Sequence, residues 1–161
     1  MTEICIEVDD RALRATLESL LTRVNDMQPV MEDIARALRN HTEDAFQDER
    51  SPFGAPWADL SNVTKAIRAK SGHWPGPILQ VTGSSGLAGS ISSAAGADWA
   101  SLGVGKEYAA THQFGRADNR FYGGPLAPIP ARPFLPIDAA GNLPDTLRNE
   151  ILAILTDALG S

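Results

Sequence analysis

The residue types that most often carry chemistry are sparse in this chain and widely spaced. His41, His73 and His112 lie far apart, and no pair has the i, i+4 spacing with which one helix face holds a metal. Cys5 is the only cysteine, so no Cys-x-x-Cys pair exists. We therefore predict no metal centre, and we interpret His41 as a core histidine and His112 as a structural one.

Two glycine-containing segments match no catalytic or nucleotide-binding pattern. Residues 83–86 (Gly-Ser-Ser-Gly) lack the Gly-x-Ser-x-Gly elbow in which a strand-to-helix turn exposes a nucleophile. Residues 103–106 (Gly-Val-Gly-Lys) lack the second half of a phosphate-binding loop. The sequence therefore predicts no serine nucleophile, no cofactor and no enzymatic activity.

Four carboxylates gather at the end of a predicted helix, at Glu43, Asp44, Asp48 and Glu49. We interpret them as a solvated face, not as paired catalytic acids. Because a helix C-terminus carries partial negative charge, acidic side chains are mildly unfavourable there. A partner's Lys or Arg beside them would remove that cost, and charge reversal at Asp44 and Asp48 tests this hypothesis.

Length and composition indicate one globular domain, residues 1–161, with 43% hydrophobic and 21% charged residues. The net charge of −6 argues against a broad basic face for nucleic acid. A single cysteine excludes an internal disulfide and suits a reducing compartment. Since the sequence shows neither a signal peptide nor a membrane-spanning run, we expect folding in the cytoplasm without a membrane partner.

Helical periodicity marks both ends of the chain. The first two stripes are Leu13, Leu17, Leu20, Leu21 and Val24, then, beyond Pro29, Met31, Ile34, Leu38, His41 and Ala45. They predict two antiparallel helices or one long helix with a break near Asn25. A C-terminal helix, capped by Asn142 and ended by Gly160, has the stripe Leu143, Leu147, Ile151, Ile154, Leu155 and Ala158.

The middle of the chain is richer in turns and short strands. Alternation predicts a strand at 4–8, a hairpin from 87–93 and 99–104, and an edge strand at 133–137. Short helices are expected at 62–70, capped by Ser61, and at 108–114, ended by Gly115. Residues 116–130 form a Gly- and Pro-rich connector. The fold class is therefore α+β, a small antiparallel sheet flanked by N-terminal helices and a C-terminal helix.

Aromatic and basic side chains beside these turns are the candidates for contacts with a partner. Trp99 is predicted to lie in the core, while Trp57 and Trp74 fit either the core or an interface, where aromatic side chains dominate the binding energy. The guanidinium of Arg132, held between Ala131 and Pro133, suits a bidentate contact with a carboxylate, within the chain or across a subunit boundary. The candidate interface residues are Trp57, Trp74, His112, Phe114, Arg116, Arg120, Phe121, Tyr122, Arg132 and Phe134.

Four short blocks follow one another between Phe46 and Leu135. They are Ser-Pro-Phe-Gly-Ala-Pro-Trp at 51–57, Ile-Leu-Gln-Val-Thr-Gly at 78–83, Tyr-Ala-Ala-Thr-His-Gln-Phe-Gly at 108–115 and Ile-Pro-Ala-Arg-Pro-Phe-Leu at 129–135. In this order they resemble the phage virion morphogenesis family, the tail-completion proteins of Mu-like and P2-like contractile-tailed phages and their prophages. The segment 83–87 departs from the family pattern by holding extra residues.

The resemblance implies a non-enzymatic structural protein of the virion tail or neck. Such a protein caps or finishes the tail tube and prepares the tail for joining to the head, as a ring by analogy with other neck and terminator proteins. We expect the connector 116–130 to order on a neighbouring subunit or on the tail end, its ends anchored by Phe114 and Phe134. The alternatives are a head-side connector or minor capsid component and, more remotely, a virion-borne cell-wall hydrolase.

Overall fold

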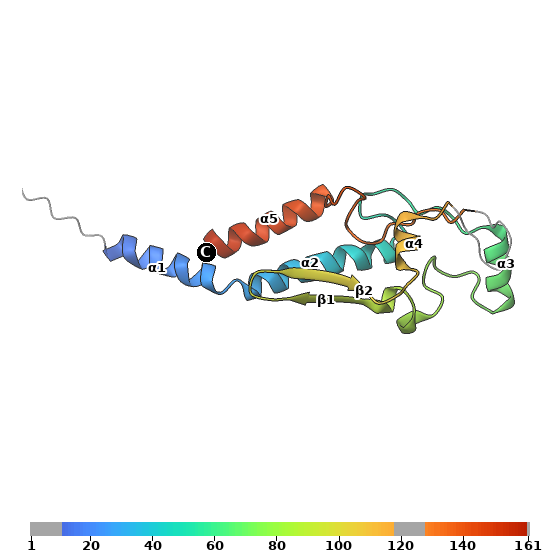
Figure 1. Ribbon diagram of the computed structural model, residues 1–161, viewed down its shortest axis with the longest axis horizontal. Coiled ribbons are helices and arrows are strands. Elements are labelled where there is room, and N and C mark those ends of the chain that lie inside the picture. Colours follow the sequence, from blue (N-terminus) through green and yellow to red (C-terminus); the bar gives the residue numbers. More distant parts are fainter. Residues whose placement is uncertain (1–10, 118–127, 161) are drawn as a thin grey trace, which may run out of the picture.

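The computed structural model describes residues 11–117 and 128–160. Its elements are α1 (Arg11–Asn25), α2 (Gln28–Gln47), α3 (Asn62–Lys70), the 3₁₀ turns η1 (Gly83–Ser85) and η2 (Ala88–Ser90), β1 (Ile91–Ala95), β2 (Ala100–Val104), α4 (Ala109–Phe114) and α5 (Asp145–Gly160). The molecule is elongated, with α1 and the end of α5 at one extremity and α3 at the other (Figure 1). The predicted α+β class is confirmed.

The first two helices run end to end, not side by side (Figure 1). The break falls at Asp26 and Met27, so the second of the two interpretations, one long helix interrupted near Asn25, is confirmed. Pro29 lies in the first turn of α2, where a missing N–H costs nothing. Leu17 and Leu21 remain largely exposed, because α1 packs only slightly against α5.

The core gathers around the C-terminal half of α2. This helix packs against both strands and against α5. Its predicted core histidine, His41, is only partly buried and its Nε2 lies 2.9 Å from a carboxylate oxygen of Glu150 on α5. The buried cluster joins α2 to the loops that follow it: Ala45, Phe46, Trp57, Leu60, Ile78, Leu87, Ile91 and Phe134.

The hairpin forms, although two details of its prediction are wrong. Strands β1 and β2 pair antiparallel from Ile91 opposite Val104 to Ala95 opposite Ala100. Residues 87–90 are not strand: Leu87 precedes the turn η2, and residues 88–90 form this turn, which packs closely on η1. Trp99 is not in the core: its side chain is 50% exposed and packs over Gly96 at the hairpin turn.

Two predictions for the C-terminal third are also wrong. Residues 133–137 form no strand, because the N–H groups of Phe134 and Leu135 donate to a glutamine side chain instead of a strand partner. Asn142 does not cap α5; its backbone N–H and its side chain bind the carboxylate of Asp138 in the preceding turn. The predicted strand 4–8, with Cys5, and the centre of the connector lie outside the described residues.

The acidic end of α2 is only partly the solvated face that the sequence predicts. Glu49 is half-buried, and its Oε1 accepts a hydrogen bond of 2.7 Å from the N–H of Ile78. Glu43 pairs with Arg39 on the same helix.

Within the described ranges 11–117 and 128–160, no helix is long and apolar enough to cross a membrane.

Candidate functional site

The two blocks at 108–115 and 129–135 are joined by Gln113, a buried side chain of α4. Its Oε1 accepts hydrogen bonds from the N–H groups of Phe134 and Leu135, each 2.9 Å long. Its Nε2 donates to the carbonyls of Ile137 at 3.2 Å and Leu135 at 3.4 Å. One side-chain amide therefore supplies hydrogen-bond partners to the backbone of residues 134–137, whose N–H and carbonyl groups would otherwise be buried without partners.

Gly115 ends α4 as predicted and brings the chain close to the other block. Its φ is 75°, a conformation that favours glycine. A Cβ at this position would lie 2.9 Å from the backbone N of Ala131, so no side chain fits there without a shift. Directly after it, Arg116 and Ile129 exchange backbone hydrogen bonds of 2.8 and 2.9 Å. The two ends of the connector are thereby held together.

An aromatic group ties the block at 51–57 to the same segment. The indole Nε1 of Trp57 donates a 2.7 Å hydrogen bond to the carbonyl of Pro133. Its ring meets Phe46 edge to face at 5.6 Å between centroids, and Phe46 lies 5.3 Å from Phe134. Such aromatic pairs contribute about 0.5–1.5 kcal/mol beyond the area that they bury. These rings fix where three segments distant in sequence meet.

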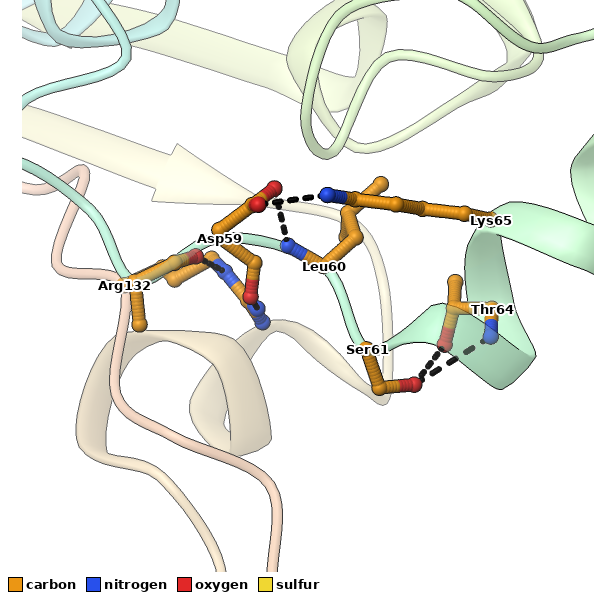
Figure 2. A network of polar contacts seen from close by, with 7 residues as sticks. Asp59, Leu60, Ser61, Thr64, Lys65 and Arg132 are labelled. Carbon is orange, nitrogen blue, oxygen red and sulfur yellow. Dashed lines mark hydrogen bonds and ion pairs between the residues drawn. The ribbon is translucent and has the colours of Figure 1, made fainter.

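A polar network continues this junction toward α3 (Figure 2). Arg132 donates from Nε to the carbonyl of Ala58 at 2.7 Å and from Nη2 to the carbonyl of Asp59 at 2.9 Å. The Asp59 carboxylate accepts from the N–H of Leu60 and pairs with the ammonium of Lys65. The predicted carboxylate partner of Arg132 is thus wrong within this chain: its guanidinium binds two backbone carbonyls.

Hydrogen bonds, burial and neighbouring charges in this region lower three pKa values. The hydrogen bond from Lys65, followed by that from the Leu60 N–H, lowers the pKa of Asp59 below its usual 3.8. Burial, followed by the positive charge of Arg132, lowers the pKa of His112. Burial also lowers the pKa of Arg132 itself, with a further contribution from the charge of Arg68. The Asp59 carboxylate is therefore held in its charged form.

The side chains of Gln113, Trp57 and Arg132 form their hydrogen bonds with backbone atoms, and so hold the junction of the three blocks in place. The Nδ1 atom of His112 is buried without a hydrogen-bond partner in the part of the chain that the structure describes, and its ring contacts Tyr108 edge to face. Among residues 11–117 and 128–160, no group of three His, Cys, Asp or Glu side chains could hold a metal ion. A hollow of about 500 Å³ beside η1 is lined mainly by small and apolar residues, together with Glu43, Gln47 and Gln80.

The candidate interface residues divide into four groups: buried, half-buried, exposed, and outside the described residues. His112 is in the half-buried group. Trp57, Arg132 and Phe134 are buried inside the chain, so the prediction that they form an interface is wrong. Trp57 and Phe134 belong to the core, and Arg132 belongs to the polar network beside it. Trp74 is half-buried beneath the Lys65 ammonium, which lies 5.2 Å from its ring centroid. Phe114 is 59% exposed and does not anchor the connector in the core. Exposed positions remain at Phe114 and Arg116, whereas Arg120, Phe121 and Tyr122 lie outside the described residues.

Sequence reasoning missed two features of this region. Gln113 was not among the candidates, because a polar residue in a short helix gives no sign that it is buried. The outward side of α3, with Val63 and Ile67, was missed because the periodicity of a short helix does not say which face meets the protein.

Comparison with known proteins gives a consistent result. The model of the phage virion morphogenesis family matches residues 8–159. The Mu-like prophage FluMu G protein 1 of Haemophilus influenzae is 36% identical over 139 residues, which cover 86% of this chain and 84% of the relative. The putative capsid assembly protein G of Escherichia phage Mu is 34% identical over 157 residues, covering 93% and 95%. No solved structure matches the chain.

Proposed function

The chain belongs to the phage virion morphogenesis family, and on that premise we propose that it completes the tail. It is a phage structural or assembly protein. The proposed role is to cap or finish the tail tube and to make the tail competent to join a head. The observation that carries this proposal is the junction described above, in which the family-like blocks at 51–57, 108–115 and 129–135 hold one another rigidly.

A rigid junction suits a protein that works by position. Gln113, Trp57 and Arg132 each form hydrogen bonds with backbone groups, and so fix loops that would otherwise vary in shape. A preformed surface loses less entropy on binding than a flexible one. We therefore propose a non-enzymatic role, in which the protein contacts other virion proteins without transforming a substrate.

The proposed working form is a homo-oligomeric ring in the tail or neck. Head-to-tail contacts between identical subunits close into a ring when the rotation between neighbours closes. Each contact then buries about 1,000 Å² or more in total to be stable. The elongated shape offers separate surfaces at its two extremities for such contacts (Figure 1).

The connector between Arg116 and Ile129 is the proposed contact with a neighbouring subunit or the tail end. Its two ends are fixed by their mutual backbone hydrogen bonds and by Gly115. Removal of residues 119–124 is expected to leave a folded protein that fails to join tails to heads. Infectious particles at normal titre would contradict this part of the proposal.

Electron microscopy of a lysate lacking the protein tests the function itself. Finished heads beside free, unjoined or overlong tails are the expected result. Unstable or empty heads would instead support a head-side role, the second candidate, which is favoured by the words "capsid assembly" in the name of the phage Mu relative. A purified-protein assay of cell-wall lysis, with His112→Ala as the comparison, tests the remote alternative of a hydrolase, and lytic activity lost in that variant would refute the non-enzymatic role.

A further inference from the structure

Helix α3 presents its apolar side to solvent and its polar side to the protein. Val63, Ala66, Ile67 and Lys70 share one face at i, i+3, i+4 and i+7 spacing. All four are exposed, with Val63 at 70% and Ile67 at 64%. On a helix that only covers a core, this apolar face would be turned inward.

The orientation of α3 is fixed by its polar contacts. Ser61 caps the first turn by accepting the N–H of Thr64 at 3.2 Å (Figure 2). On the inner face, Lys65 pairs with Asp59 and lies over the ring of Trp74. Arg68 donates a 2.8 Å hydrogen bond to the carbonyl of Pro77. Rotating the apolar face inward would break these contacts and carry the ammonium of Lys70 into the protein, so the exposed face belongs to the fold.

The exposed face of α3 is also basic at its edge. The helix contains three basic residues and no acidic one, in a chain of net charge −6. Lys70 lies on the apolar face itself, and its ammonium has no ion pair with the residues that the structure describes. A matching surface therefore needs an apolar contact and an unpaired carboxylate beside it.

The same chain carries such a surface at the end of α2. Asp44 and Asp48 line a hollow of about 190 Å³ together with His41, Arg50, Pro52 and Gly54, next to the exposed ring of Phe53. The guanidinium of Arg50 donates to the carbonyl of Gly54, 2.8 Å away, and forms no ion pair with either carboxylate. Neither carboxylate forms an ion pair within the described residues, and both lie near a helix C-terminus, where negative charge is unfavourable. A cation from outside the chain would relieve this repulsion.

We propose that the outer face of α3 docks on the acidic end of α2 in a second copy of this chain. Val63 and Ile67 then cover Phe53 and Pro52, and the ammonium of Lys70 lies beside Asp44 and Asp48. The contact joins two different surfaces, and when each copy uses them toward two different neighbours it is head-to-tail, the type that closes into rings. This inference rests on the proposed homo-oligomer and specifies its interface.

A photoreactive amino acid at position 67 tests the contact during particle assembly. The expected product is a covalent dimer whose crosslinked peptide lies within residues 41–54 of the second copy. The same amino acid at Asn149, an exposed position on α5, is the matched control and should give no such dimer. A crosslink to another protein, a crosslink to a different segment, or monomer alone would overturn the proposal.

A charge exchange provides a second measurement. Lys70→Glu and Asp48→Lys should each lower the dimer yield about tenfold, equivalent to about 1.4 kcal/mol of interface energy. The double variant should restore it, while thermal unfolding shows no loss of stability, because both side chains are exposed and a lysine suits a helix C-terminus. Equal yields in the single and double variants would overturn the interface. This outcome is distinct from failure of the proposed function, because free tails in a deletion lysate do not depend on which surfaces the copies use.

Discussion

Replacing Gln113 by leucine is expected to destabilise the protein more than any single polar substitution on its surface. Leucine fits the volume but removes an acceptor shared by two backbone N–H groups, of Phe134 and Leu135, each at 2.9 Å. The N–H of Phe134 belongs to a fully buried residue. Each buried group left unpaired costs about 1–3 kcal/mol, so we expect a loss of about 3 kcal/mol in the free energy of unfolding.

Urea unfolding followed by circular dichroism measures this loss. A shift of the midpoint without a change of slope would indicate lower stability of the folded state. Gln47→Leu on the exposed side of α2 is the matched control, and we expect it to change stability by no more than about 0.5 kcal/mol. A loss below about 1 kcal/mol in Gln113→Leu would refute the reasoning, because it would show that the segment finds other partners at little cost.

Three further substitutions test the same junction. Gly115→Ala should lose about 1–3 kcal/mol in urea unfolding, because φ is 75° and the new Cβ would lie 2.9 Å from the N of Ala131. Arg132→Lys should lower the free energy of unfolding by about 1–2 kcal/mol, since an ammonium cannot reproduce the two guanidinium donors at their fixed spacing. Unchanged stability would mean that the fold does not need these two hydrogen bonds. The lowered pKa of Asp59 stabilises the fold above the carboxyl's unfolded pKa near 3.8, and this contribution is lost as pH falls through the folded value. Asp59→Asn should therefore flatten the fall of melting temperature below pH 4, whereas an identical acid profile would exclude a role for the Lys65 pair.

The local structure followed closely from the sequence wherever short-range chemistry decides it. Ser61 caps α3 and Gly115 ends α4, as the preference of hydroxyls for N-caps and of glycine for left-handed backbone predicts. The hairpin also follows from local alternation. Its first strand begins later than predicted, at Ile91, because the preceding residues form a turn in which Gly89 lies close to Ser84. These features depend on residues a few positions apart, which a sequence displays directly.

The junction could not be derived in the same way, because its partners are distant along the chain. Trp57 and Pro133 are separated by 76 residues, and Arg132 and Ala58 by 74. The motif blocks identified the segments, but a buried Arg132 and an exposed one have the same neighbours in sequence. Residue type alone therefore predicts an interface role for Trp57 and Phe134, whereas both lie in the core.

The sequence alone determined the α+β class, the position of most helices and, through four ordered blocks, the family. Only the tertiary structure decided which side of each element is covered. Periodicity records that Val63 and Ile67 share a face of α3, but the ion pair of Lys65 and the hydrogen bond of Arg68 turn that face to solvent. Which face is buried depends on the sum of contacts with distant segments, and that sum exists only once the chain has folded.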